Sequence, residues 1–170
     1  MKTTKWLWLL VACVLSNVIT ESFSQSEKLL PKPYQAAFGN AELVMEGSKE
    51  ELKSKLTEWI SVSRDGAYNF EDVRVSIQWV EKLDGIEVNK NESYQLEVTA
   101  EQIAIQAVKE QGAFYALQTL LQLADEKEGK LVIPESRILD RPAFRIRGFM
   151  HDVGRSFIPV EELMKQIEIL

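Results

Sequence analysis

Cysteine and histidine are almost absent from this sequence, which has one residue of each, Cys13 and His151, among 170. A single cysteine cannot form an intrachain disulfide, and a lone histidine has no partner at metal-ligand spacing, so disulfide scaffolds and zinc sites are excluded. Positive charge is also scarce, because 20 lysines and arginines face 26 aspartates and glutamates, for a net charge of −6. An acidic chain without a basic patch repels phosphate backbones, which argues against a nucleic acid partner.

Long apolar runs are missing as well, and the one near the amino terminus is short. Two lysines begin residues 1–24, an apolar run follows from Trp6 to Leu15, and small residues stand at Ser22 to Ser24. This order predicts a secretory signal peptide cleaved after Ser24, and hence a periplasmic or secreted protein. The run is shorter than the about 20 residues of a membrane-spanning helix, so no stable membrane span is expected. A lipoprotein signal ending at Cys13, which would anchor the protein to the outer membrane, is the alternative.

Cleavage of the signal peptide would make the chain more acidic. It removes Lys2, Lys5 and Glu21, so the exported chain keeps 18 basic and 25 acidic residues, a net charge of −7. Cys13 leaves with the same segment, and packing alone then holds the core of the exported protein. Neither a metal nor a cofactor is expected.

Two helices are predicted within residues 25–141. The first runs from Ser48 to Ile60, because Ser48 can cap it, acids follow in the first turn, and apolar residues recur at helical spacing. The second begins at Glu110 and ends before Gly129, and its helical spacing predicts a core stripe at Phe114, Leu117, Leu121 and Ala124.

Strand patterns fill the rest of residues 25–141. Apolar and polar residues alternate over residues 73–79, and two alternating runs over residues 94–108 are joined by a short polar turn, which is typical of a β-hairpin. Shorter extended segments are expected at residues 41–46, 131–134 and 136–139, with a turn at 64–69. These elements predict an α+β domain, a mostly antiparallel sheet with two helices on one face.

Residues 142–170 read as a separate unit. The pattern predicts a strand over residues 146–153 and then a helix with Pro159 near its start and Leu163, Ile167 and Leu170 on one face. A strand followed by a helix directly after a linker is typical of the first βα unit of a TIM (β/α)8 barrel. We therefore expect this segment to be the start of a second, truncated domain.

Two motifs, about thirty residues apart, resemble those of one enzyme family. "GAFYALQTLLQL" and "RPAFRIRGFMHDVGRSFIP" are similar to the end of the amino-terminal non-catalytic domain and to the first barrel strand of bacterial β-N-acetylhexosaminidases, glycoside hydrolase family 20. The family pattern R-G-x-M-x-D-x-x-R stands here as Arg147, Gly148, Met150, Asp152 and Arg155. The resemblance implies a retaining mechanism assisted by the acetamido group of the substrate, an exception to the two-carboxylate scheme of most glycosidases.

The resemblance also implies roles for the residues of the second motif. Arg147 corresponds to the family's sugar-binding arginine, and its planar fork of donors suits two neighbouring hydroxyl groups; the alternative is an arginine paired with a nearby acid for structure. Asp152, Arg155 and His151 are interpreted as loop support.

No catalytic residue is expected in this chain. The resemblance implies an Asp-Glu pair much later in the barrel, and adjacent acids at helix ends or in turns are ordinarily solvated. The pairs of this kind are Glu50–Glu51, Glu71–Asp72, Asp125–Glu126 and Glu161–Glu162.

Two functions remain open at this level. The first is the amino-terminal part of an exported β-N-acetylhexosaminidase, which hydrolyses terminal N-acetylhexosamine residues of glycans. The second is a free-standing accessory or carbohydrate-binding module without activity. An apolar strand and helix over residues 142–170 would be an aggregation liability in a free-standing module, which favours the enzyme.

Overall fold

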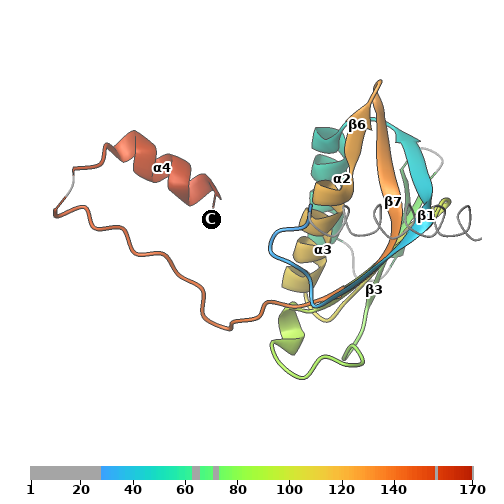
Figure 1. Cartoon of the computed structure of the whole chain (residues 1–170), viewed down its shortest axis with the longest axis horizontal. Helices are drawn as coiled ribbons and strands as arrows, with labels where there is room; N and C mark the ends of the chain where they lie inside the picture. The colour runs from blue at the N-terminus through green and yellow to red at the C-terminus, as the bar shows by residue number, and fades with distance from the viewer. Residues whose placement is uncertain (1–27, 63–65, 71–72, 156, 170) are drawn as a thin grey trace, which may run out of the picture.

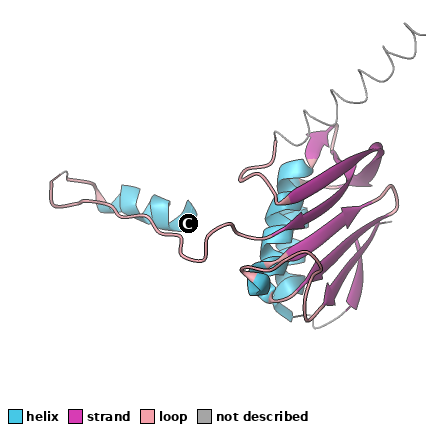
Figure 2. Ribbon diagram, turned by 60° about the horizontal axis from the view of Figure 1, so that its bottom comes forward, coloured by secondary structure: helices cyan, strands magenta, loops and turns pink. Residues whose placement is uncertain are grey.

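The protein forms one mixed sheet with two helices packed on one of its faces (Figures 1 and 2). The computed structural model describes residues 28–62, 66–70, 73–155 and 157–169. The predicted signal peptide with Cys13, the acid pair Glu71–Asp72 and the last residue, Leu170, lie outside the described residues.

Seven described strands make up the sheet. Their order is β1-β7-β4-β5-β3-β2, and β6 pairs with β7 beside this path. All pairs are antiparallel except β3 with β5, which run parallel, so the predicted α+β class is confirmed with a mixed sheet. The strands are β1 (Gln35–Glu46), β2 (Gly66–Phe70), β3 (Val73–Trp79), β4 (Tyr94–Val98), β5 (Gln102–Ala107), β6 (Asp125–Lys127) and β7 (Lys130–Asp140).

The alternation of the central strands follows the predicted pattern. On β3, Val73, Val75 and Ile77 are buried while Arg74 and Gln78 are exposed. The hairpin is formed by β4 and β5, in which every second side chain is buried. Because successive side chains of a strand point to opposite faces, one face of the sheet carries the core and the other a set of polar residues.

Helix α2 (Lys49–Val62) covers part of the core face, as predicted. The Ser48 hydroxyl accepts a hydrogen bond from the backbone nitrogen of Glu51 at 3.2 Å, which caps the helix. Leu52 and Leu56 are fully buried at the spacing of one helical turn, and Ile60 continues the same stripe.

Helix α3 (Glu110–Leu123) lies where a helix was predicted. Of the predicted core stripe, Leu117 and Ala124 are buried and Leu121 packs against the core, so the prediction is wrong at one residue. Phe114, expected in the core, is 46% exposed. The buried face of the helix consists of small residues and leucines: Gly112, Ala113, Ala116, Leu117, Leu120 and Leu123. Small side chains let the helix approach the sheet and its neighbour α2 closely, and the large aromatic ring is left on the outer side.

Three strand boundaries also differ from the predictions. The two short segments expected after α3 form one continuous strand, β7, which pairs with β1, β4 and β6 at once. β1 begins at Gln35 and carries an irregularity between Phe38 and Glu42 that a local pattern does not reveal. Residues 66–70, expected in a turn, form β2 against β3. In each case a partner strand stabilises the extended backbone, and for β1 and β7 that partner lies far along the chain.

The predicted strand over residues 146–153 is not formed. Residues 141–155 follow an irregular path on the helix side of the sheet (Figure 1). Ile146, Phe149 and Met150 of this segment are exposed. A strand requires a neighbouring strand for its backbone hydrogen bonds, and residues 146–153 have none among the described residues. The helix that follows is present as α4 (Val160–Ile169). Among the described residues, no helix is both long and apolar enough to span a bilayer.

Candidate functional site

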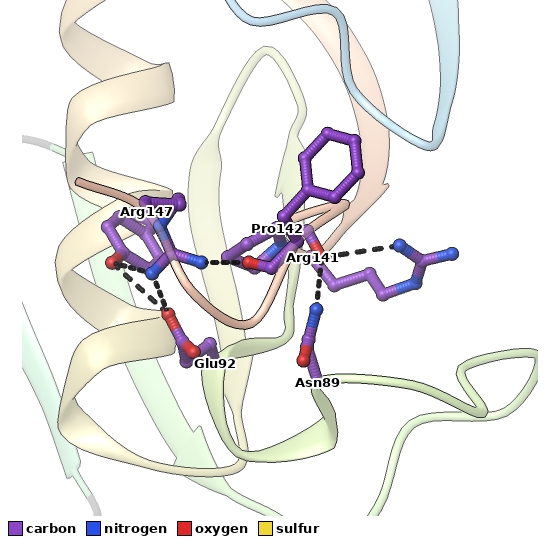
Figure 3. A network of polar contacts seen from close by, with 7 residues as sticks. Asn89, Glu92, Arg141, Pro142 and Arg147 are labelled. Atoms are coloured by element: carbon purple, nitrogen blue, oxygen red, sulfur yellow. Dashed lines mark hydrogen bonds and ion pairs between the residues drawn. The ribbon is translucent and has the colours of Figure 1, made fainter. Parts of the chain in front are cut away.

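Arg147 makes polar contacts with three groups, two of them on the folded domain (Figure 3). Its Nη2 atom donates to the carboxylate of Glu92, with which it forms an ion pair, and to the Tyr115 hydroxyl at 3.1 Å. Its Nη1 atom donates to the backbone oxygen of Phe144 at 2.5 Å. The Tyr115 hydroxyl in turn donates to Glu92 at 3.3 Å, so the three side chains close a ring of polar contacts.

The charge of Arg147 is stabilised in this ring. The hydrogen bond from the guanidinium to Glu92 is the main cause that raises the pKa of Arg147 above its ordinary value. The arginine side chain is 45% exposed and that of Glu92 is 23% exposed. A half-exposed pair of this kind contributes about 1 kcal/mol or less to stability, so it orients the side chain more than it holds the fold.

The linker before Arg147 is attached at two further points. The Asn89 side chain donates to the backbone oxygen of Pro142 at 2.7 Å, and Asn89 reaches this position with a left-handed backbone (φ 51°). The guanidinium of Arg141 lies over the ring of Tyr34, 4.9 Å from its centroid. Residues 141–147 are therefore held on the domain from both sides, between the segment that precedes β1 and the short helix η1 (Lys90–Glu92).

A polar network lies beneath the linker at the end of β7. Asp140 accepts from the backbone nitrogen of Tyr34 at 2.8 Å and from the Tyr94 hydroxyl at 3.3 Å. The Tyr94 hydroxyl also shares a hydrogen bond with the Thr119 hydroxyl at 2.5 Å. Burial is the main cause that raises the pKa of Asp140 and of Tyr94.

These contacts surround a groove of about 650 Å³ between three segments. Residues 29–34 form one wall, α3 forms the floor, and residues 140–147 form the other wall. Aromatic side chains from all three segments line it, namely Tyr34, Tyr115 and Phe144. This groove, with Arg147 at one end, is the place where the sequence motif meets the folded domain.

The other residues of the second motif lie along the chain beyond the groove. Asp152 Oδ1 accepts from the backbone nitrogens of Gly154 and Arg155 at 2.9 and 3.1 Å, and its Oδ2 lies 3.4 Å from Arg155 Nε. His151 Nδ1 is 2.8 Å from Gln166 Oε1, and its ring meets the Phe149 ring edge to face. These are local contacts within residues 149–166, and they do not bring Asp152 or His151 to Arg147.

The adjacent acids that the structure describes do not converge on a pocket. Glu50 and Glu51 begin α2, and Glu161 and Glu162 begin α4, all exposed. Asp125 pairs with Lys28 at 2.9 Å, and the hydrogen bond from this lysine is the main cause that lowers the pKa of Asp125. Within the described residues, no group of three or more histidine, cysteine or acidic side chains could hold a metal ion.

Sequence patterns did not single out Glu92 as a partner of Arg147. The two residues are 55 positions apart, and nothing in their local spacing relates them. Tyr115 is visible in the sequence only as one aromatic among several on a helix. The structural interpretation of Arg147, pairing with a nearby acid, agrees with this contact, while its role in binding sugar stays a prediction.

Comparison with known proteins places the chain in a family. A model of glycosyl hydrolase family 20, domain 2, matches residues 27–141. The chain therefore belongs to glycosyl hydrolase family 20, and the resemblance drawn from its two motifs is confirmed.

Individual relatives agree with this assignment. The beta-hexosaminidase of Porphyromonas gingivalis is 40% identical over 88 residues, which is 48% of this chain and 11% of that protein. The N,N′-diacetylchitobiase of Vibrio harveyi is 32% identical over 97 residues, 57% of this chain and 11% of that protein. A crystal structure of an inactive mutant of the Vibrio harveyi exo-β-N-acetylglucosaminidase superposes with a TM-score of 0.61 at 25% identity, covering 85% of this chain and 24% of that one. The chain thus spans a small part of the proteins it matches.

Proposed function

We propose that this chain is the amino-terminal part of an exported β-N-acetylhexosaminidase that removes terminal, non-reducing N-acetylhexosamine residues from glycans. The observation that carries the proposal is the match of residues 27–141 to family 20, a family of glycosyl hydrolases. The names of the relatives, beta-hexosaminidase and diacetylchitobiase, support the class of substrate.

The proposed mechanism is the substrate-assisted, retaining one that the motif resemblance implies. The acetamido oxygen of the substrate attacks the anomeric carbon, one acid protonates the leaving oxygen, and a neighbouring acid orients the acetamido group. The adjacent acids that the structure describes do not converge on a pocket, so we expect the catalytic pair to lie in a part of the enzyme outside these 170 residues.

Arg147 is the residue of this chain that we expect to contact the sugar. Its Nη2 atom is engaged by Glu92 and Tyr115 in the structure, so a ring hydroxyl would have to share or replace one of these contacts. Since Arg147 is 45% exposed, part of its guanidinium remains accessible for such an exchange. A charged hydrogen bond to substrate contributes about 1.5–3 kcal/mol.

An assay of the full-length enzyme tests this function. Cleavage of an aryl N-acetyl-β-glucosaminide by the complete protein is expected, together with the absence of turnover by residues 1–170 alone. Arg147→Ala in the complete protein should lower kcat/KM by roughly one to two orders of magnitude, with Arg155→Ala as a control in the same motif. Turnover by the 170-residue chain would contradict the assignment of the catalytic pair, and a fully active Arg147→Ala enzyme would contradict the role of Arg147.

A free-standing accessory module is the second candidate. It is favoured by the core of the domain, whose members all lie between Leu29 and Ile138 and none in residues 142–169. Under this function the complete gene product would bind glycans without cleaving them. The same assay separates the two candidates, because only the enzyme releases the aryl group.

A further inference from the structure

The face of the sheet opposite α2 and α3 carries a row of five residues in register, four glutamines and Leu139, one on each of five strands. Gln95 on β4 is paired in register with Leu139 on β7 and with Gln106 on β5. The row continues to Gln35 on β1 at one end and to Gln78 on β3 at the other. Because these residues alternate with the buried residues of the core, their side chains point away from the helices.

The row borders a groove of about 1000 Å³ on this open face. Residues 82–84 of the loop after β3 form a wall, and the groove is floored by side chains of four strands. Its lining consists of Gln35, Ala36, Ala37, Lys82, Leu83, Asp84, Gln95, Glu97, Gln106, Arg137 and Leu139. One face of an antiparallel sheet is often simply exposed to solvent. Here the loop residues 82–84 also line this face, which makes it concave.

The polar groups of the groove retain hydrogen-bonding capacity. Gln106 donates to Gln78 at 3.1 Å, whereas the side chains of Gln35 and Gln95 make no hydrogen bond to any described residue. Glu97 and Arg137 are paired in register on adjacent strands and still form no ion pair among the described residues. Free amide, carboxylate and guanidinium groups on one concave surface are the groups with which proteins bind hydroxyl and amide groups of ligands.

Charge restricts the class of ligand further. Two basic residues, Lys82 and Arg137, and two acidic residues, Asp84 and Glu97, line the groove, so its lining is neutral although the chain has a net charge of −6. A neutral lining does not attract a phosphate, a nucleic acid or a cation over other solutes. It suits an uncharged chain of hydroxyl and acetamido groups.

We propose that this open-face groove is a second, non-catalytic binding site for an uncharged oligosaccharide of N-acetylhexosamine units, held by Gln95 and Gln106. The groove that Arg147 lines includes residues of α3 and therefore lies on the helix side of the sheet. The two grooves are on opposite faces, so both can be occupied without competition. The choice of N-acetylhexosamine rests on the proposed function, whereas the position of the site does not depend on catalysis. Its role would be to hold the enzyme on a glycan.

Calorimetry on the 170-residue chain tests the proposal with a β-1,4-linked tetramer of N-acetylglucosamine. Saturable binding with a Kd at or below about 1 mM is expected. The double variant Gln95→Ala/Gln106→Ala should weaken it by about tenfold or more, since two hydrogen-bonding groups are lost. Gln102→Ala is the matched control, because Gln102 is an exposed glutamine on the same strand outside the groove, and its Kd should stay within about twofold.

Three results would overturn the inference. They are the absence of binding up to about 10 mM, binding that the double variant leaves unchanged, and binding that Tyr115→Ala abolishes instead. Stronger binding of dextran sulfate than of the neutral tetramer would contradict the neutral-ligand assignment. The titration measures binding by a chain that is expected to be inactive, so a failure to bind the tetramer would not contradict the enzymatic function. A failed activity assay of the full-length enzyme would not contradict binding in the open-face groove, which the titration tests separately.

Discussion

The carboxylate of Glu92 forms an ion pair with the guanidinium of Arg147, a residue 55 positions further along the chain. The contact joins the short helix η1 of the domain to the second of the two sequence motifs, which lies beyond the residues 27–141 that match the family model. It positions Arg147 on the surface of the domain, and Tyr115 hydrogen-bonds to both residues of the pair. Residues 141–147 are thus attached to the domain by side-chain contacts rather than by strand pairing of their backbone.

Replacing Glu92 by glutamine should loosen this attachment without unfolding the domain. The amide keeps the size and an acceptor but removes the charge, and the pair is partly exposed, so we expect a loss of about 1 kcal/mol or less in global stability. Hydrogen exchange at residues 143–147 should become faster. Glu87→Gln is the control, because Glu87 is an exposed acid near η1 whose ion pair with Lys90 is 3.4 Å long. Equal exchange rates in both variants would show that Glu92 does not hold the linker.

Gly112 should be intolerant of a side chain although it lies in a helix. A Cβ atom at this position would come within 2.3 Å of the backbone oxygen of Ser93, which also accepts from Val108 at 3.3 Å. Helix propensity alone would favour alanine by about 1 kcal/mol, but overpacking against fixed backbone costs about 1–3 kcal/mol. Gly112→Ala should therefore lower the denaturation midpoint. Gly148→Ala, where a Cβ meets nothing within 4 Å, should leave it unchanged, and the opposite order of the two variants would refute the close approach.

A charge on the core face of β3 should prevent folding. Ile77 is 2% exposed between the sheet and the helices, so Ile77→Asp would bury a carboxylate without a partner. We expect no cooperative unfolding transition for this variant by circular dichroism. Gln102→Asp places the same charge on the exposed side of the neighbouring strand and should fold normally. A native-like transition of Ile77→Asp would mean that the face of β3 is assigned wrongly.

Asp140 should make stability depend on pH in the acidic range. Burial raises the pKa of this carboxyl above its ordinary value of 3.8, so the folded state holds a proton at pH values where the unfolded state has lost it. The stabilisation from the protonated form is complete below pH 3.8 and is lost as the pH rises through the folded pKa.

Asp140→Asn isolates this contribution, because the amide is neutral at every pH and can still accept from Tyr34. The free energy of unfolding of the variant, relative to the parent protein, should increase between pH 3.8 and neutrality. Urea titrations at several pH values measure the difference. A difference that is constant with pH, or that falls as the pH rises, would contradict the raised pKa.

Local patterns were sufficient for the elements whose neighbours are close in sequence. α2 was predicted from its cap at Ser48 and its leucine spacing, and the hairpin of β4 and β5 from two alternating runs with a short turn between them. Both elements depend on contacts between residues that are close in sequence, and the spacing of apolar residues reveals such contacts directly.

Elements with distant partners were predicted less well. β1 and the full length of β7 are extended because strands far along the chain pair with them, and no local pattern states which strands will be neighbours. β2 is a different case, because its partner β3 follows directly and residues 64–69 were predicted as a turn. The face of α3 was misjudged at Phe114 for a related reason, since the close approach of the helix at Gly112 and Ala116 decides which side is buried. The strand expected over residues 146–153 has no neighbour to pair with in the described chain.

The amino-acid sequence by itself determined the class of the domain, the place of both of its helices and the family, because periodicity and a motif survive without knowledge of the fold. Only the tertiary structure decided which side chains meet. Folding brings Glu92 and Tyr115 to Arg147. It also pairs Gln95 with Gln106 on adjacent strands, where both side chains line the open-face groove. Such pairs lie on different elements, and their distance is set by how strands and helices pack rather than by their spacing along the chain.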